Sequence, residues 1–462
     1  MLEFIKKAIF IGAGLASMTA EKIEEAGAEI VRKGEISEKQ GRELVQELKE
    51  RSGKARKDLG DRVEKMIEEA LQKLKIPTRK EVEELKARIE RLEKEKGGAS
   101  RTSCPGGAPP RAPDFERFRT VLLRKKEPDR VPLGDISVHP LLKQGILGRP
   151  VRTLEDEVAF WCQAGYDHVP LEQGLQLTEV IRKQSMHSID AHYGGEPTET
   201  QTRSWATEGK GLITTRADFE AFRWPDPDSL DYSAFEKIGS LLPPKVKVIA
   251  ILGKIFTNVW WLMGLEGMSL SLADEPDLVP RMFEKVGKFQ FRVFENMLRF
   301  DCVGAVWHAD DIAFSTALMV SPRILRQHLF PWYKEMNRIA HEKGRLAIYH
   351  SDGALQEVME DIIDCGFDGL NPLEPKAMDI KEIKRKYGSR ISLLGNIDLI
   401  YTLTRGTPDE VRAEVRQRIH DLAPGGGYAV ASANSLPEYV PLANFNALRE
   451  ATFEYGKYPI SV

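Results

Sequence analysis

The sequence predicts an α/β protein, a closed (β/α)8 TIM barrel preceded by an all-α, coiled-coil N-terminal region. After residue 113, eight short apolar runs alternate with segments of helical length, which is the rhythm of βαβ units. The runs are almost continuously apolar, as expected for parallel strands that are covered on both faces. Before residue 97 the chain is rich in Glu, Lys, Arg, Ala and Leu and contains a single proline. An open, doubly wound sheet is the alternative fold for the same alternation.

Residues 1–96 are predicted to be helical and to self-associate. Four of their apolar residues are spaced by three, four and three positions, which is the a and d pattern of a coiled coil. These residues are Val82, Leu85, Ile89 and Leu92. A helix with so narrow an apolar seam needs a partner, so we expect a homo-oligomer. Residues 97–113 are rich in glycine and proline and are expected to form a linker to a barrel at 114–462.

The composition excludes several classes of protein. The net charge is −3, without the clustered excess of Lys and Arg that binds nucleic acid. The four cysteines lie far apart with no Cys-x-x-Cys spacing, which argues against a disulfide framework and a thiolate zinc site and favours a cytoplasmic location. No run approaches the ~20 apolar residues of a membrane span. The apolar run at 8–20 is short and interrupted by glycines, so we expect no signal peptide there.

The apolar runs and the segments between them define the expected elements. Strands are expected at 131–136, 168–171, 246–252, 303–308, 346–350, 369–373, 391–394 and 428–431. Helices are expected at 153–164, 277–299, 322–343, 355–365 and 380–387. Residues 173–244 are an insertion that contains Trp205 and Trp224, and we expect it to cover the barrel mouth.

Polar residues stand at nearly all of the expected strand ends, where (β/α)8 barrels gather their functional groups. The candidate catalytic residues are Asp310, Asp311, His350 and Asp352. The candidate substrate-binding residues are Asp135, His308, Asn371, Glu374, Asn396, Asp398 and Asn434. Further polar residues at these ends are Glu172, Asn258 and Ser432.

The pair Asp310 and Asp311 is predicted to supply an acid or a base. Adjacent carboxylates repel each other, so the pKa of one of them is expected to rise toward neutrality. The alternative is that one of the two caps the helix that follows or pairs with an arginine. His308, just before them, is either part of the site or a packed, hydrogen-bonded residue.

His350 and Asp352 are two residues apart, which in an extended segment directs both side chains to the same side. This geometry suits a proton relay, a histidine oriented by a carboxylate, or two ligands of a metal ion. A metal site needs further ligands, for which Asn434 and Glu374 are the candidates. Carboxylate and amide oxygens favour harder ions than zinc, and the sequence leaves the presence of a divalent metal open.

The motifs after residue 115 resemble the uroporphyrinogen decarboxylase superfamily. They are Asp-Arg-Val-Pro at 129–132, His-Ala-Asp-Asp-Ile at 308–312, His-Ser-Asp-Gly at 350–353, Gly-Leu-Asn-Pro-Leu-Glu-Pro at 369–375, Leu-Gly-Asn-Ile-Asp at 394–398 and the closing Tyr-Gly-Lys-Tyr-Pro-Ile at 455–460. The resemblance implies a (β/α)8 barrel. It also implies either a porphyrinogen decarboxylase or a methyltransferase that depends on cobalamin or a corrinoid protein.

Two departures from the family motifs favour the methyltransferase branch without its zinc site. The resemblance to the decarboxylases implies an arginine-rich segment after the first strand, whereas residues 134–140 contain no arginine. The resemblance to the methyltransferases implies a zinc site made by His-x-Cys and a later Cys, whereas Asp352 and Asn434 stand at about the positions of these two cysteines. We therefore expect a methyltransferase that uses a corrinoid, with a small O- or N-methyl compound as donor.

Two other functions remain as alternatives. One is a carboxy-lyase, including uroporphyrinogen decarboxylase in porphyrin biosynthesis. The other is a scaffold that binds a ligand without turnover.

Residues 1–96 resemble the phasins of polyhydroxyalkanoate granules, in the opening segment 1–20, the Gly-Glu-Ile-Ser turn at 34–37 and the junction at 75–85. This second resemblance implies oligomerisation and attachment to a granule or another surface, and a purely oligomerising arm is its alternative.

Overall fold

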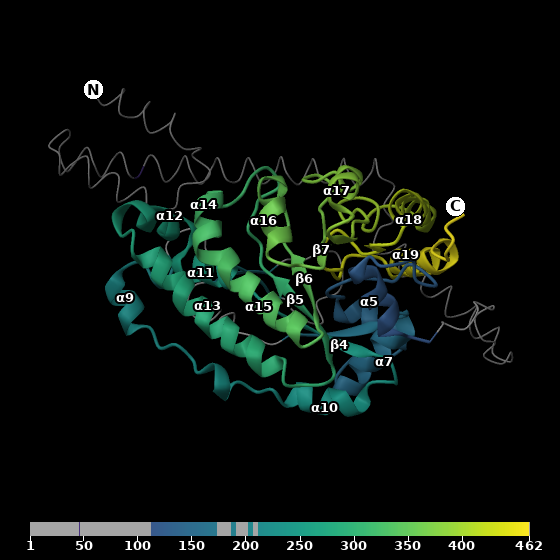
Figure 1. Cartoon of the computed structure of the whole chain (residues 1–462), viewed down its shortest axis with the longest axis horizontal. Helices are drawn as coiled ribbons and strands as arrows, with labels where there is room; N and C mark the ends of the chain where they lie inside the picture. Colours follow the sequence, from purple (N-terminus) through teal and green to yellow (C-terminus); the bar gives the residue numbers. More distant parts are fainter. Residues whose placement is uncertain (1–45, 47–111, 173–185, 191–201, 207–210, 462) are drawn as a thin grey trace, which may run out of the picture. The chain divides into compact units, whose positions relative to one another are not determined.

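The structure of the chain is a computed structural model that describes residues 46, 112–172, 186–190, 202–206 and 211–461. The expected coiled coil and all but the last two residues of the expected linker lie outside the described residues. None of the helices within the described residues is long and apolar enough to cross a membrane. The described part is an α/β unit in which helices pack against one parallel sheet (Figure 1).

Seven strands form the parallel sheet, and their order in the sheet is their order along the chain. They are β1 (His168–Glu172), β4 (Lys247–Gly253), β5 (Val303–Ala309), β6 (Leu346–His350), β7 (Gly369–Asn371), β8 (Ser392–Leu394) and β9 (Tyr428–Ala429). Each coincides with an expected strand. A doubly wound sheet reverses its order at a switch point, so the observed order excludes the doubly wound alternative.

The first expected strand, at 131–136, is the exception. It forms no continuous ladder with the sheet. Leu133 makes an isolated parallel bridge to Val430, and Val138, just beyond the expected strand, makes another to Leu436. The amide of Gly134 donates to the carbonyl of Val430 at 2.8 Å. This segment therefore lies beside β9 at the free edge of the sheet, in the position expected for the first strand of a barrel.

Helices connect the strands and cover the outer face of the sheet. They are α5 (Phe115–Leu123), α6 (Pro140–Leu147), α7 (Leu154–Ala164), α9 (Arg216–Ala221), α10 (Ser233–Leu241), α11 (Ile255–Met263), α12 (Leu265–Asp274), α13 (Leu278–Met297), α14 (Pro322–Ile324), α15 (Phe330–Glu342), α16 (Met359–Asp364), α17 (Ile380–Tyr387), α18 (Pro408–Leu422) and α19 (Leu442–Tyr455). Short 3-10 or π turns are η2 (Pro227–Ser229), η3 (Leu325–Leu329) and η4 (Gln356–Val358). Capping boxes begin α7 and α18, at Thr153 and Thr407.

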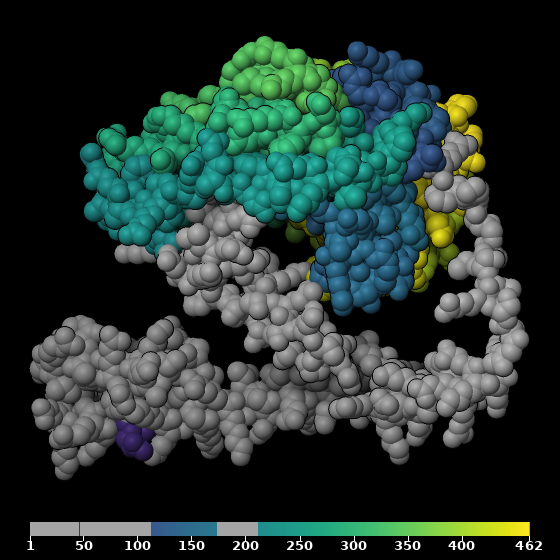
Figure 2. Space-filling model, turned by 90° about the horizontal axis from the view of Figure 1, so that it is seen from below, coloured from purple at the N-terminus to yellow at the C-terminus, as the bar shows by residue number. Residues whose placement is uncertain are grey.

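The insertion contains a hairpin that the sequence does not predict, β2 (Met186–Asp190) paired antiparallel with β3 (Thr202–Ala206). The part of the insertion that follows α9 runs along α13 (Figure 1). On the face shown in Figure 2, the segment from α9 to α13 adjoins the segment that contains α7. The indole of Trp224 contacts the ring of Phe222 at 4.8 Å, and the ammonium of Lys285 in α13 lies over it. Trp224 therefore packs on an outer helix and not over the strand ends. The side chain of Trp205 is outside the described residues.

Alternate residues of β4, β5 and β6 enter two different apolar clusters. In β4, Val248, Ala250 and Leu252 pack in the cluster shared with the outer helices. Ile249 and Ile251 belong to the second cluster, together with Trp307 of β5. This two-residue period fills both faces of the sheet and explains the continuously apolar strand sequences.

Helix α5 closes the amino end of the sheet interior. Its amide at Phe115 donates to the carbonyl of Lys245, just before β4, at 2.8 Å. The guanidinium of Arg124 donates to the carbonyl of Asp368, just before β7, at 2.8 Å. Phe115 and Phe118 enter the inner apolar cluster. One end of the interior is thereby sealed, and the functional groups remain at the carboxyl ends of the strands.

Candidate functional site

Three of the predicted catalytic residues meet at the carboxyl ends of β5 and β6. They are Asp311, His350 and Asp352, whose nearest nitrogen and oxygen atoms all lie within 4.8 Å of one another. The Nε2 atom of His350 is 3.9 Å from Oδ1 of Asp311 and 3.9 Å from Oδ1 of Asp352. The histidine side chain is 9% exposed, and the two aspartates are 48% and 29% exposed. The cluster is therefore anchored in the sheet and open to solvent on its aspartate side.

Asn371, at the end of β7, orients the ring of His350. Its side-chain amide donates to the carbonyl of Leu394 at 3.0 Å, which leaves its Oδ1 to face Nδ1 of His350 at 2.5 Å. Because Oδ1 of an amide only accepts, Nδ1 carries the proton in this arrangement. The Nε2 lone pair of His350 then points toward the two aspartates.

The two carboxylates are held by the loops that follow β5, β6 and β9. The amide of Asp352 donates to Oδ1 of Asp311 at 2.9 Å. The side-chain amide of Asn434 donates to Oδ2 of Asp352 at 2.5 Å. Burial raises the pKa of Asp352 to about 6. Asn434 thus acts on the cluster through Asp352.

Asp310 is separated from this cluster although it precedes Asp311 in sequence. It is 1% exposed and accepts the amides of Phe256 and Thr257 at 2.9 and 2.7 Å, at the first turn of α11. The hydroxyls of Thr257 and Tyr333 also donate to it, at 2.8 and 2.5 Å. Burial raises the pKa of Asp310 to about 6. Both of its carboxylate oxygens accept from protein donors, so Asp310 caps a helix, but this helix is α11, which precedes it in the sequence, and not the helix that follows.

His308 and Asp135 also lie outside the cluster. His308 is inside β5, fully buried, and its ring contacts those of Tyr333 and Phe367 at 5.0 and 5.5 Å between the sheet and the helices. Burial lowers its pKa to about 3. Asp135 accepts the hydroxyl of Tyr166 at 2.6 Å and that of Ser432 at 2.7 Å, and burial raises its pKa. Asp135 therefore ties the segment after residue 131 to the end of β9.

Of the remaining predicted residues, some hold loops in place and some line a cavity. Asn396 is buried and donates to the carbonyl of Leu373 at 2.6 Å. Asp398 accepts the amides of the turn after β8, including that of Tyr401 at 2.8 Å. Glu374 pairs with Lys376 at 3.0 Å. Asp398 and Glu374 line the same cavity.

This cavity has a volume of about 520 Å³ and adjoins the cluster through Asn434, which lines it and bonds Asp352. Two further lining residues, Arg405 and Tyr439, are absent from the sequence-based candidates. They lie in the loops after β8 and β9, beyond the strand ends on which the sequence search concentrates. A hollow of this size accommodates a small organic substrate.

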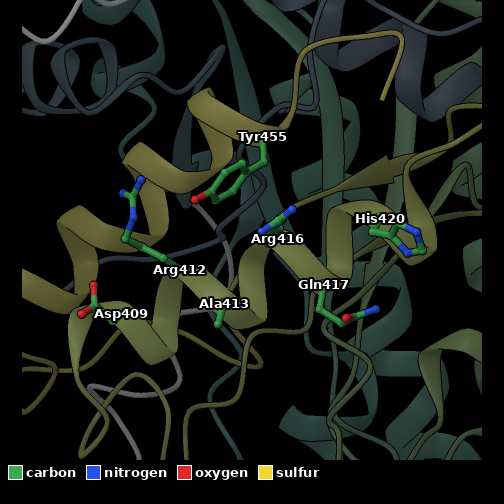
Figure 3. Close-up of a pocket in the computed structure, with 7 residues that line it drawn as sticks. All are labelled: Asp409, Arg412, Ala413, Arg416, Gln417, His420 and Tyr455. Carbon is green, nitrogen blue, oxygen red and sulfur yellow. The ribbon is translucent and has the colours of Figure 1, made fainter. Parts of the chain in front are cut away.

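A second hollow, of about 490 Å³, lies on the outside of the molecule between α18 and α19 (Figure 3). The ring of Tyr455 lies beneath the guanidinium groups of Arg412 and Arg416, at 5.8 and 5.7 Å. Arg412 is also paired with Glu454. None of its lining residues is a strand-end candidate, so we place the functional site at the cluster and its adjoining cavity.

Comparison with known families agrees with this arrangement. The uroporphyrinogen decarboxylase (URO-D) family model matches residues 209–455, which include every strand of the sheet from β4 onward. The chain belongs to the uroporphyrinogen decarboxylase family. The model of the poly(hydroxyalcanoate) granule associated protein, or phasin, matches residues 9–100. Both sequence resemblances are thereby confirmed.

The relatives of this chain include two kinds of enzyme. A methylcobamide:CoM methyltransferase, MtaA, from Methanosarcina barkeri is 29% identical over 228 residues, 46% of this chain and 64% of the relative. The chain thus spans less than two thirds of that relative's length. A uroporphyrinogen decarboxylase from Pseudomonas fluorescens is 26% identical over 53% of this chain and 70% of its own length.

A solved structure shows the same fold. A methyltransferase from Methanosarcina mazei superposes with a TM-score of 0.53 at 19% identity, covering 73% of this chain and 98% of its own. The URO-D fold of this chain is therefore shared with a methyltransferase, while the identity is too low to transfer its activity.

A thiolate zinc centre, the metal site implied by the family resemblance, does not fit the residues present. Asp352 and Asn434 occupy the positions expected for cysteines, and the cluster contains no sulfur atom. Cys365 is buried and bonds the carbonyl of Phe330, and Cys302 bonds that of Phe235. The third described cysteine, Cys162, lies in α7, so no described cysteine is part of the cluster.

Proposed function

We propose that this member of the URO-D family is a corrinoid-dependent methyltransferase that demethylates a small O- or N-methyl compound. The observation that carries the proposal is the composition of the strand ends. Two carboxylates and one imidazole nitrogen converge there beside a cavity of about 520 Å³. Such a site orients and polarises a small heteroatom-containing substrate.

The same composition argues against a porphyrinogen as substrate. A tetrapyrrole with many carboxylates needs several cationic side chains. The described lining of the cavity contains Arg405 together with the acidic side chains of Glu374 and Asp398. Arg405 and the similarity to a decarboxylase keep a carboxy-lyase as the second candidate.

We infer that the seven strands and the segment after residue 131 form the wall of a closed (β/α)8 barrel. The isolated bridges of Leu133 and Val138 place that segment beside β9, as the eighth position requires. The carboxyl-end loops would then surround a single mouth, which contains the cluster and the cavity.

The chain's own residues bind and orient the methyl donor. His350 and Asp352 polarise the heteroatom that carries the methyl group, directly or through an ion, and Asn371 and Asn434 hold these two side chains in place. A corrinoid, when bound, would supply the nucleophilic cobalt for the methyl group. The protein's task is to hold the carbon–heteroatom bond in line with it and to stabilise charge on the leaving atom.

Exposed apolar side chains around the strand ends suit the docking of a corrinoid protein. Phe314 follows β5, Ile400 and Tyr401 follow β8, and Tyr439 follows β9. Their exposed fractions range from 43% to 56%. Large exposed apolar groups gathered on one side of a soluble domain are typical of a protein interface.

The test combines the purified full-length protein with methylcobalamin and a small alcohol or amine as methyl acceptor and, separately, with a porphyrinogen. Methyl transfer is followed by the corrinoid absorbance and decarboxylation by the loss of carboxyl groups. We expect methyl exchange that is lost in His350→Ala and kept in the control His341→Gln. Decarboxylation without any response of the corrinoid would replace this proposal by the carboxy-lyase.

A further inference from the structure

The cluster at the ends of β5 and β6 has the features of a metal site without sulfur. We propose that Asp311, His350 and Asp352 bind one divalent first-row transition cation through one imidazole nitrogen and two carboxylate oxygens. All three ligand atoms lie within 4.8 Å of one another. The inference depends on this geometry and not on the proposed methyl transfer.

The imidazole is prepared for a cation by its outer hydrogen bond. Oδ1 of Asn371 accepts the Nδ1 proton of His350 at 2.5 Å, so the lone pair is on Nε2. The side chain is nine-tenths buried, and Nε2 makes no hydrogen bond among the described residues. Metal-ligating histidines commonly show this arrangement, in which the outer partner determines the tautomer and the orientation of the ring.

The distances in the cluster differ from those of a simple histidine–aspartate pair. In the pair His341 and Asp368, elsewhere in this chain, Nε2 and the carboxylate oxygen are 2.8 Å apart. In the cluster, both carboxylates remain 3.9 Å from Nε2 of His350. Around an ion with bonds of about 2.1 Å, tetrahedral ligand atoms are about 3.4 Å apart. Each of the two nitrogen–oxygen distances would therefore shorten by about 0.5 Å when the cluster binds an ion.

The charges in the cluster also lack a counterpart. Oδ1 of Asp352 is buried without a hydrogen-bond partner, while its Oδ2 is held by Asn434. Within the described residues, no Lys or Arg forms an ion pair with Asp311 or Asp352. Two carboxylates and a lone pair repel one another unless a positive charge lies between them. A bound cation supplies that charge.

The ligand types indicate the kind of cation. Imidazole nitrogen suits Zn²⁺ and Fe²⁺, and carboxylate suits Mn²⁺, whereas Mg²⁺ prefers oxygen ligands alone and retains its waters. The site therefore differs in chemistry from a His-x-Cys zinc centre. Asp311 is 48% exposed, so water or a substrate oxygen can complete the coordination from the solvent side.

Metal content tests the proposal directly. The full-length protein is stripped with a chelator, dialysed against Zn²⁺, Mn²⁺ or Mg²⁺, and analysed for bound metal. We expect about one more Zn²⁺ or Mn²⁺ per chain in the wild type than in His350→Ala or Asp352→Asn. The control His341→Gln removes a histidine outside the cluster and should retain the ion. Equal metal content in the wild type and both cluster variants, or occupancy by Mg²⁺ alone, would overturn the proposal.

Co²⁺ reports the ligand atoms independently of activity. We expect visible d–d bands in the loaded wild type without a thiolate-to-cobalt charge-transfer band, and the appearance of that band in Asp352→Cys. A thiolate band in the wild type, or none in a folded, cobalt-loaded Asp352→Cys, would contradict the proposal. Methyl transfer is measured separately. Failure of methyl transfer with this ion bound would refute the proposed function alone, and methyl transfer without any bound ion would refute the metal site alone.

Discussion

The Nδ1 atom of His350 lies 2.5 Å from Oδ1 of Asn371, and the side-chain amide of Asn371 donates to the carbonyl of Leu394 on the next strand. Three adjacent strands, β6, β7 and β8, thereby determine which ring nitrogen of His350 faces Asp311 and Asp352. The orientation of the histidine is a property of the sheet and not of a flexible loop.

Asn371→Ala tests this positioning role. We expect the fold to remain and the affinity for Zn²⁺ or Mn²⁺ to fall by about tenfold or more, because outer partners of ligating histidines have effects of that size. Calorimetric titration of the stripped protein measures the affinity. Asn371→Asp retains an acceptor at the same place and should restore most of it. Unchanged affinity in Asn371→Ala would show that the ring needs no external orientation.

Asp310 and Asp311 are neighbours in sequence, but replacing them with alanine is expected to affect different properties: stability for Asp310 and metal binding for Asp311. Asp310→Ala removes the cap of α11 and leaves the buried hydroxyl of Tyr333 without its acceptor. We expect it to lower the free energy of unfolding by about 2–4 kcal/mol. Asp311→Ala affects a half-exposed side chain and should cost less than about 1 kcal/mol while abolishing metal binding. Urea denaturation and metal analysis of both variants give the comparison. A reversed pattern would assign the functional role to Asp310.

Local patterns predict much of this fold because parallel strands must be apolar on both faces. The expected run at 346–350 is β6, and Ile380–Tyr387 is α17 as expected. The β2–β3 hairpin has no such signal, since its sequence is polar and lies in an insertion. Residues 131–136 have the apolar run of a strand but form only isolated bridges.

The site is harder to predict, because side-chain roles depend on contacts between distant segments. The two-residue spacing of His350 and Asp352 correctly indicates that they lie together. Asp310 cannot be distinguished from Asp311 by sequence, because the amide that it caps at Thr257 is 53 residues away. The sequence places His308 at the strand end, but β5 continues to Ala309, so the strand period turns the ring toward the outer helices.

The His341 and Asp368 pair predicts a pH dependence of stability. The hydrogen bond to Asp368 raises the pKa of His341 above its usual value of about 6.5. The charged form is favoured in the folded state, so the stabilisation is complete below the unfolded pKa and is lost as the pH rises through the folded pKa. We expect His341→Gln to lower stability more at about pH 5.5 than at about pH 8.5. Urea midpoints at the two values measure this, and equal losses would contradict it.

The apolar seam at 82–92 predicts the oligomeric state of the full chain. Lysines in place of Leu85 and Ile89 would put like charges into the a and d positions, which destabilises a coiled coil. We expect the wild type to sediment as an oligomer and the double variant Leu85→Lys, Ile89→Lys to sediment as a smaller species. Lysine at Glu83 and Glu90, which lie outside the seam, provides the control. Identical sedimentation of wild type and seam variant would show that this seam does not mediate assembly.

Arg405 lies in the cavity lining beside two acidic residues, Glu374 and Asp398, and its side chain is exposed. A guanidinium in this place can bind a carboxylate of the substrate, but it has nothing to bind in a neutral methyl ether. We therefore expect Arg405→Gln to raise KM by about tenfold for a methyl donor that carries a carboxylate and to leave KM unchanged for a neutral one. Steady-state kinetics with such a matched pair of donors measures the effect. A fall of kcat with both donors would mean that Arg405 acts in the reaction itself, and the cavity would then bind the reacting group and not only the remainder of the substrate.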